Sequence, residues 1–396
     1  MHATKIILTD EQQDMLNGKQ GKEMAMALQT LIEMGQHLGA TKLVPITRCH
    51  ITGSFAISAF KGYYELLDRM VAAGLHVKVP TSCNPHPGRT FSTQNRQLYK
   101  GDAHHTECFK KLGVIQNWSC VSYYTENVPK FGEICGFGES SVVVMSNSMI
   151  GARTNIWGVF LDFCQAVTGL TPYFGLLLDE NRYAEMLFDI SGIKKMDCDA
   201  LGLFVGKTAV DKTPVLTHYP FDKFQLKHLL PAMASSGGVR MAHVEGLTPE
   251  APDLKTALGG KDPIKTVKVT QADIDAFRAP KKLVEDCGAV VFGCPQTSFE
   301  EATELGKYFV GKTVKVRTLI CMTPLDLTRL KEYEIHGQML DAGVEFSPMC
   351  PLVGLTVRLK KEYKNIITSS GKLHWYNEGA QYGTEEDCLR HAGVLD

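Results

Sequence analysis

The sequence predicts an α/β fold built on a mainly parallel sheet. Apolar residues recur at helical spacing over 23–34, and a short run of strand-forming residues follows at 42–47. A second helical stretch, 57–73, ends at Gly74, and 76–80 again has the composition of a strand. This order of strand, helix and strand is the βαβ pattern that packs helices on a parallel sheet.

Later segments extend the same pattern and suggest three lobes. Further β-like runs are 114–118, 142–146, 289–292, 314–321, 344–346 and 365–368. Helices are expected beside them, for example over 299–310 and 325–342. The stretch 213–280 differs, because it contains a Ser-Ser-Gly-Gly turn and a segment rich in Gly, Pro and Lys. We expect an N-terminal α/β lobe over 1–200, a middle lobe over 201–283 and a C-terminal α/β lobe over 284–396.

The composition is that of a globular protein without a basic surface. The 396 residues are 44% hydrophobic and 21% charged, and the formal net charge is −1. This balance of charges does not indicate a basic surface that would bind nucleic acid or an anionic membrane. Residues 1–16 contain a helix capping box at 9–12 instead of an apolar signal core, and no apolar run is long enough to span a bilayer. We therefore expect a cytoplasmic protein.

Thiols and polar side chains recur where the predicted strands end. In open α/β sheets, ligands bind beyond the carboxyl ends of the strands. The residues at these positions include Cys49, His50, Cys83, Cys120, Asn147, Ser148, Cys294, Cys350, Ser370 and Lys372. The twelve cysteines contain no CxxC pair, so a compact zinc knuckle is not supported. Three thiolates from different strand ends could hold an iron–sulfur cluster; alternatively, these cysteines are buried packing residues.

Single residues allow both a functional and a structural interpretation. His50 suits a catalytic acid or ligand, and equally a hydrogen-bonded loop histidine. Arg153 and Lys372 follow β-like runs and suit a carboxylate or phosphate, or are ordinary solvated charges. The segment 179–182 is either a substrate-facing cluster or a helix N-terminus. Since GxGxxG and GxSxG are absent, neither a dinucleotide site nor a serine hydrolase is supported.

Longer motifs carry a resemblance to a known family. The central ones are ESSV at 139–142, SNSMIGARTN at 146–155 and LDENR at 178–182. Matching pieces continue in order along the chain: His50 with Gly53-Ser54, 81–85, 127–133, 235–250, 293–295, Cys350 and 365–372. Together these motifs resemble the large subunit of aconitase X, over nearly the whole chain.

The resemblance implies an aconitase-like fold of three α/β lobes around a central cleft. It implies an iron–sulfur cluster, [4Fe-4S] or [2Fe-2S], held by Cys120, Cys294 and Cys350. It implies dehydration of a small hydroxy acid, with cis-3-hydroxy-L-proline expected first and mevalonate 5-phosphate as the alternative. It also implies a separate small subunit whose swivelling domain carries the catalytic serine.

Site roles follow from the motifs together with the strand-end positions. We expect His50, Glu139, Arg153 and Lys372 to act in catalysis. Arg153 and Lys372 would hold the substrate anion, while His50 or Glu139 would support proton transfer. The expected substrate-binding residues are Ser54, Asn147, Ser148, Asn155 and Ser370.

Some residues depart from the family pattern and leave other interpretations open. Residues 156–158 read IWG, where the archaeal phosphomevalonate branch more often has Arg-Glu-Gly. Residues 160–164, FLDFC, look more like the bacterial hydroxyproline branch. Two rival classes remain: a non-catalytic iron–sulfur sensor or binding protein, and a metal-free enzyme that uses a thiolate beside a histidine, such as Cys49 with His50.

Overall fold

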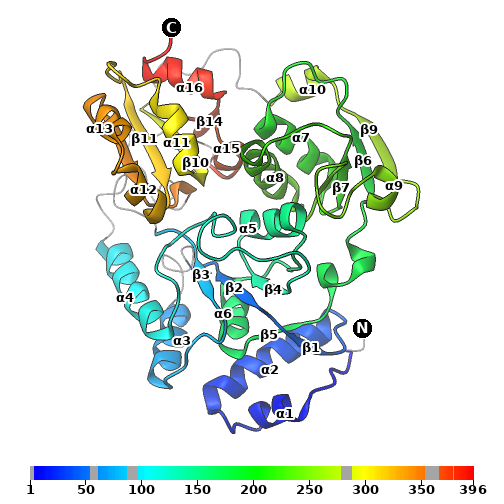
Figure 1. Ribbon diagram of the computed structural model, residues 1–396. Coiled ribbons are helices and arrows are strands. Elements are labelled where there is room, and N and C mark those ends of the chain that lie inside the picture. The colour runs from blue at the N-terminus through cyan, green and yellow to red at the C-terminus, as the bar shows by residue number, and fades with distance from the viewer. Residues whose placement is uncertain (1–3, 54–60, 87–95, 278–287, 353–364, 378) are drawn as a thin grey trace. The chain divides into compact units, whose positions relative to one another are not determined.

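The computed structural model describes residues 4–53, 61–86, 96–277, 288–352, 365–377 and 379–396, drawn as ribbons in Figure 1. The chain forms two compact units. Unit 1 comprises residues 1–84, 96–116 and 122–183, and unit 2 comprises residues 85–95, 117–121 and 184–396. Residues 117–121 thus belong to a different unit from their neighbours in sequence, and Cys120 lies in unit 2.

Unit 1 contains a three-stranded parallel sheet and a two-stranded antiparallel one. The parallel sheet has the order β3-β2-β4, with β2 (Arg48–Ile51) at its centre between β3 (Thr81–Cys83) and β4 (Cys135–Phe137). In the other sheet, β1 (Leu43–Pro45) pairs with β5 (Leu170–Pro172). The helices are α1 (Asp10–Leu16), α2 (Lys22–His37), α3 (Lys61–Ala72), α4 (Arg96–Leu112), α5 (Ser140–Met145) and α6 (Val159–Thr168).

Three β-like runs in the first half of the chain do not form strands where the sequence predicted them. The strand predicted over 142–146 is wrong, because these residues lie in α5 and in the π-helical turn Ser146–Ile150 that follows. Its valines are buried on every side, and a short apolar run of this kind is ambiguous between a strand and a buried helix. The runs 76–80 and 114–118 are loops, and the nearest strand, β3, begins directly after the first of them.

The first sheet of unit 2 is parallel, with the order β8-β7-β6-β9. Its strands are β6 (Met186–Asp189), β7 (Pro214–Leu216), β8 (His243–Val244) and β9 (Lys265–Lys268). The accompanying helices are α7 (Cys198–Ala209), α8 (Lys223–Gly237), α9 (Leu254–Ala257) and α10 (Gln271–Asp275). Helices α7 and α8 lie side by side (Figure 1), and glycine permits this, because a Cβ on Gly206 would meet the Met233 carbonyl oxygen at 2.5 Å.

The second sheet of unit 2 is also parallel, with the order β12-β11-β10-β13-β14. Its strands are β10 (Ala289–Thr297), β11 (Arg317–Met322), β12 (Val344–Ser347), β13 (Ile366–Thr368) and β14 (Ala380–Tyr382). The four β-like runs predicted after residue 288 are thereby confirmed. The helices are α11 (Phe299–Gly306), α12 (Pro324–Leu330), α13 (Glu334–Asp341), α15 (Gly371–Tyr376) and α16 (Glu385–Ala392). The single helix predicted over 325–342 is two helices, α12 and α13.

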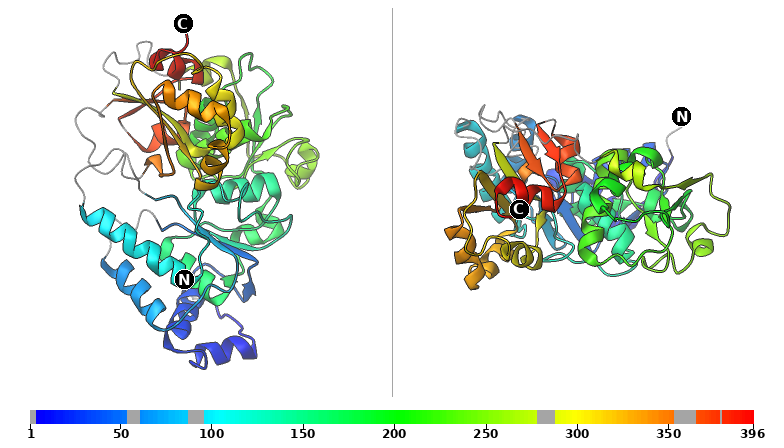
Figure 2. Two further views of the ribbon diagram at one scale, coloured as in Figure 1. Left: turned by 60° about the vertical axis from the view of Figure 1, so that its left-hand side comes forward. Right: turned by 90° about the horizontal axis from the view of Figure 1, so that it is seen from above.

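Alternate residues of this sheet enter different cores. Val290, Phe292 and Ile320 pack against α11, α12, α13 and α16; Figure 2 shows α16 against the sheet in two views. Ala289 and Val291 point to the opposite face, where the core contains α15 and the cysteines Cys294, Cys321 and Cys350. The period-two alternation of a strand therefore gives two separate cores, and the one on the α15 side contains three of the cysteines.

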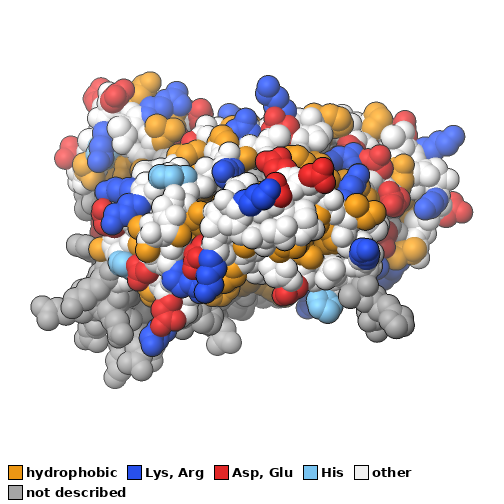
Figure 3. All heavy atoms as spheres, turned by 90° about the horizontal axis from the view of Figure 1, so that it is seen from below, with side chains coloured by type: hydrophobic (Ala, Val, Ile, Leu, Met, Phe, Trp, Pro, Cys, Tyr) orange, Lys and Arg blue, Asp and Glu red, His pale blue; other side chains and the backbone are white. Residues whose placement is uncertain are grey.

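The surface agrees with the near-neutral net charge. On the face in Figure 3, basic and acidic side chains are interspersed. Among the helices that the structure describes, none is long and apolar enough to cross a bilayer.

Candidate active site

The strand order of the second sheet in unit 2 reverses between β10 and β13. Strands β11 and β12 lie on one side of β10, whereas β13 and β14 lie on the other. In such sheets the crevice at the carboxyl ends of the two central strands is the usual ligand site. Cys294 lies near the end of β10, and Ser370 follows β13 and donates its hydroxyl to the Cys294 carbonyl oxygen. Two residues expected in the site therefore meet at the reversal point.

The three cysteines expected as cluster ligands all lie in unit 2. Cys120, Cys294 and Cys350 are only 5–6% exposed, and every cysteine that the structure describes is a free thiol. The backbone N–H of Cys350 donates to the His86 carbonyl oxygen at 2.7 Å, which holds its loop. Burial raises the pKa of Cys321 well above its ordinary value, and the thiols of Cys350 and Cys120 raise it further. Cys350 and Cys120 therefore both lie within electrostatic reach of the Cys321 thiol.

Gln296 connects the segments that carry the three cysteines. Its side chain is fully buried; its Oε1 accepts the backbone N–H of Cys120 at 3.2 Å, and its Nε2 donates to the carbonyl oxygens of Met322 at 2.9 Å and Pro348 at 3.4 Å. The backbone N–H of Gln296 also donates to the Cys120 sulfur at 3.2 Å. No local sequence pattern indicates this role, since 176 residues separate Gln296 from Cys120.

We predict that Gln296→Met, which keeps the volume but loses the amide, will weaken iron retention. Each lost hydrogen bond is worth about 1 kcal/mol, so the cysteine loops should lose roughly 2–3 kcal/mol of support. Iron and sulfide per chain, measured after anaerobic purification and dialysis, should fall several-fold. The matched control is Gln165→Met in unit 1, where Gln165 is equally buried. Equal iron retention in the two variants would show that Gln296 does not position the cysteines.

The turn after β13 is held by hydrogen bonds at Ser370 and at Gly371. Ser370 caps α15 by accepting the N–H of Leu373 at 3.0 Å, and the N–H of Gly371 donates to the Asp199 carboxylate at 2.6 Å. Lys372 is buried, with 5% of its surface exposed, so it is not the ordinary solvated charge that the sequence left open. Burying an ammonium group is costly without polar partners, which favours a fixed place for this lysine.

In unit 1, His50 lies on the central strand β2 and is completely buried. Its Nδ1 lies 2.8 Å from the Ser82 hydroxyl and 3.3 Å from the Ser122 hydroxyl. Burial lowers the pKa of His50 to about 4, an effect that outweighs the neighbouring Glu139 carboxylate and the Asn84 side chain. The imidazole is therefore neutral at pH 7, as a proton acceptor must be.

Several other residues expected in the site have structural partners in unit 1. Glu139 caps α5 by accepting the N–H of Val142 at 2.8 Å. The Asn147 amide exchanges two hydrogen bonds of 3.0 Å with the backbone of Thr154. The Asn155 amide bonds the Phe174 carbonyl oxygen and the Leu176 N–H. These contacts shape the signature loops, and substrate binding by the two asparagines stays a prediction.

Three further residues were expected in the site: Arg153, Ser148 and Ser54. Arg153 donates to the Leu177 carbonyl oxygen at 2.9 Å and pairs with the Asp179 carboxylate. Ser148 is buried, and Ser54 lies outside the described residues. The segment 179–182 that the sequence singled out also contains a residue whose role was missed. Arg182 is 2% exposed and donates to the carbonyl oxygens of Leu176, Asn147 and Ala152, so it holds the signature loops together.

Comparison with known proteins supplies the family. Models of the first, second and third domains of aconitase X match residues 5–180, 184–279 and 287–394. The phosphomevalonate dehydratase large subunit of Thermococcus kodakarensis is 31% identical over 93% of this chain and 94% of its own length. The cis-3-hydroxy-L-proline dehydratase of Pseudomonas aeruginosa is 30% identical over 76% of this chain but 53% of its own length.

A solved structure agrees with these matches. The aconitase X crystal structure from Thermococcus kodakaraensis, in its holo form, superimposes with a TM-score of 0.86 and 28% identity, covering 98% of this chain and 100% of that one. The predicted α/β, aconitase-like fold is therefore confirmed. The chain belongs to the aconitase X family and is a dehydratase, that is, a hydro-lyase.

Proposed function

We propose that this chain is the large subunit of a cytoplasmic iron–sulfur dehydratase that acts on a small hydroxy acid, with cis-3-hydroxy-L-proline as its substrate. The observation that carries the proposal is that Cys294 and Cys350 share one buried cluster in unit 2, beside the point where the strand order reverses, while the sulfur of Cys120 accepts the N–H of Gln296, two residues after Cys294. Three buried thiols on separate segments are a suitable donor set for a cluster that leaves one iron open.

The donor set fits the cluster in a second respect. The backbone N–H of Gln296 points at the Cys120 sulfur, and hydrogen bonds of this kind stabilise thiolate ligands. When bound, the cluster supplies a Lewis-acidic iron for the hydroxyl that leaves. Both [4Fe-4S] and [2Fe-2S] clusters are compatible with three cysteine ligands of this kind.

The protein's own residues would handle charge and protons. We propose that Lys372 holds the substrate carboxylate, because it is a buried cation two residues after Ser370, whose hydroxyl bonds the Cys294 carbonyl oxygen. Arg153 would assist by exchanging its Asp179 partner for substrate. His50, neutral at pH 7, would support proton transfer, with Glu139 as the alternative.

The substrate preference has a specific rival. Mevalonate 5-phosphate is favoured by the nearly full-length matches to the archaeal large subunits, which include 29% identity over 96% of the Methanosarcina mazei subunit. That substrate carries a phosphate as well as a carboxylate and needs additional cations. Of the two arginines in the described signature segments, Arg182 is buried and donates to three backbone carbonyl oxygens, which leaves Arg153 as the one that could turn to substrate. We therefore place the less highly charged hydroxyproline first.

We further propose that a separate small subunit completes the enzyme. The archaeal relatives are named as large subunits, and the Pseudomonas enzyme extends well beyond its match to this chain. We infer that the unmatched part of the Pseudomonas enzyme corresponds to such a subunit. A partner that closes over the site would exclude water and strengthen each electrostatic contact there.

Reconstitution tests this proposal. The chain would be purified anaerobically with full iron and sulfide content, then assayed with and without the candidate small subunit on cis-3-hydroxy-L-proline and on mevalonate 5-phosphate. We expect turnover of hydroxyproline by the pair alone. Turnover of the phosphate ester instead would replace the substrate, and full turnover by the isolated chain would remove the partner from the proposal. A chain that holds iron but dehydrates neither compound with its partner would contradict both substrates.

A further inference from the structure

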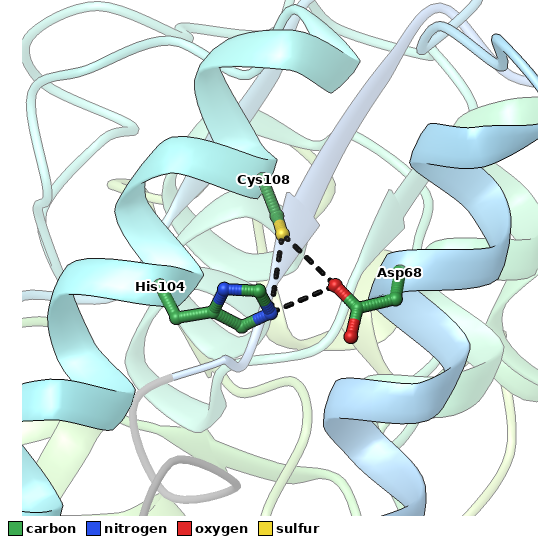
Figure 4. A group of neighbouring side chains, drawn as sticks. All are labelled: Asp68, His104 and Cys108. Atoms are coloured by element: carbon green, nitrogen blue, oxygen red, sulfur yellow. Dashed lines mark hydrogen bonds and ion pairs between the residues drawn. The ribbon is translucent and has the colours of Figure 1, made fainter.

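Unit 1 contains a second group of possible metal ligands, formed by helices α3 and α4. Asp68 lies on α3, and His104 and Cys108 are four residues apart on α4, so their side chains share one face of that helix. His104 Nε2 is 2.8 Å from Asp68 Oδ1, and the Cys108 sulfur is 3.7 Å from that nitrogen and 3.9 Å from that oxygen. The three atoms converge on one point between the helices (Figure 4).

The geometry is unlike that of a catalytic triad. In a triad, one imidazole nitrogen faces the nucleophile and the other faces the carboxylate. Here a single nitrogen, Nε2, faces both the Cys108 sulfur and the Asp68 carboxylate, while the other nitrogen points away from the group (Figure 4). Three donors aimed at a common point are the arrangement that binds a cation.

The separations are close to those of a tetrahedral zinc site. Zinc bonds of about 2.3 Å to sulfur and about 2.1 Å to nitrogen and oxygen put the sulfur roughly 3.6 Å from the other two ligands, which lie roughly 3.4 Å apart. The two sulfur distances agree within about 0.3 Å of these values. The shorter distance, between nitrogen and oxygen, is a hydrogen bond that a bound ion would open and replace.

The surroundings allow binding without rearrangement of the helices. The side chains of His104 and Asp68 are 45% and 58% exposed, so an ion and a water in the fourth position can enter. Cys108 is buried at the base of the group, 4% exposed. The Tyr64 ring, one turn before Asp68 on α3, packs against the His104 ring with centroids 5.7 Å apart and limits its rotation.

We propose that Asp68, His104 and Cys108 bind one divalent transition-metal ion, with Zn²⁺ as the best fit. A thiolate, a carboxylate and a neutral imidazole carry two negative charges and neutralise the ion. The ion connects α3 to α4 through these three ligands, and its fourth coordination position is open to water. The site is independent of the proposed iron–sulfur site, since it shares none of its cysteines and lies in the other unit.

The test is zinc stoichiometry on the whole chain. Protein freed of metal anaerobically would be titrated with Zn²⁺ against a chromophoric competitor, for wild type, His104→Ala and Cys108→Ala. Cys120, Cys294 and Cys350 can also bind zinc, but equally in all three proteins. The result is therefore the difference in zinc bound per chain between wild type and each variant. Wild type should bind one ion more than either variant. Glu107→Gln, an exposed change on the same helix, is the matched control and should bind as wild type does.

Two further measurements keep the outcome decisive. The Co²⁺ difference spectrum, wild type minus Cys108→Ala, should contain a thiolate-to-metal charge-transfer band, because the bands of the other cysteines cancel. Asp68→Asn, a mild change on the surface, should keep the band and weaken binding by more than about 10-fold, since even residues that only orient a ligand are worth about 10–100-fold. Equal zinc stoichiometry in wild type and Cys108→Ala, or a cobalt band unaffected by that substitution, would overturn the proposal.

Discussion

Replacing Cys350 with alanine should abolish dehydration and leave a folded chain that no longer retains iron. Cys350 is 6% exposed, and its loop is fixed by the bond from its N–H to the His86 carbonyl oxygen. Cys120→Ala and Cys294→Ala should act in the same way, because a cluster with an open iron has no spare protein ligand. Iron, acid-labile sulfide, visible absorbance and turnover would be measured on anaerobic protein, beside far-ultraviolet circular dichroism for folding.

Cys321→Ala is the matched control for this experiment. Cys321 is fully buried in the same apolar cluster as Cys294 and Cys350, so its removal costs similar packing energy. It should keep its iron and most of its activity. If Cys321→Ala loses iron while Cys350→Ala retains it, then the ligand assignment is wrong and Cys321 takes the place of Cys350. If all four variants retain iron, the proposal of a thiolate-bound cluster fails.

The later strands of the chain were predictable because they are buried on both faces. Runs such as 289–292 and 365–368 are short, apolar and rich in β-branched residues, which is the pattern of a central parallel strand. The run 142–146 has the same composition but is helical. There Glu139 caps the first turn, and the valines fill a core that surrounds the helix; neither the cap contact nor the surrounding core is visible in the run itself.

The residues of the candidate site could be proposed from the sequence, whereas the contacts that support them could not. Cys120 was singled out as following a strand over 114–118, and that strand does not exist. The loop 117–121 instead joins unit 2, where Gln296 binds its backbone. The partners of Gln296 lie on three separate segments, and no local pattern reports such contacts. Arg182 was missed as a structural residue for the same reason, since its acceptors are backbone carbonyl groups, which every residue has.

Four charged residues in unit 2 form a network that contacts the turn after β13, where Ser370 and Gly371 lie. Glu301 on α11 pairs with Lys227 and His228 of α8, and His228 Nδ1 lies 2.8 Å from the Asp199 carboxylate. Asp199 in turn accepts the N–H of Gly371, beside Ser370. The side chain of Lys227 is 1% exposed and that of Glu301 is 17% exposed, so water screens this pair little.

The contributions of His228 and Glu301 to the stability of the fold should depend on pH in opposite directions. The carboxylates of Asp199 and Glu301 raise the pKa of His228 to about 10 despite its burial. Its stabilising contribution is therefore complete below its unfolded value of about 6.5 and is lost as the pH rises towards 10. The cations hold the pKa of Glu301 far below its usual range, against the effect of burial. The contribution of Glu301 is complete above about pH 4.3 and is lost as the pH falls further.

Glu301→Gln should therefore destabilise the protein by about 3 kcal/mol at pH 7, because it leaves two cations without their shared anion. The amide keeps the capping interaction, since its oxygen can still accept from Ser298, whose N–H and hydroxyl both donate to Glu301 at the start of α11. The change thus isolates the charge. Urea unfolding followed by circular dichroism would measure it, with Glu304→Gln as the matched control on the same helix. Glu304 pairs with Lys307 in full exposure, with side chains 71% and 63% accessible, so its loss should cost less than about 1 kcal/mol. If the two substitutions shift the unfolding midpoint equally, the network contributes no more than a surface ion pair, and the turn at Ser370 does not depend on it.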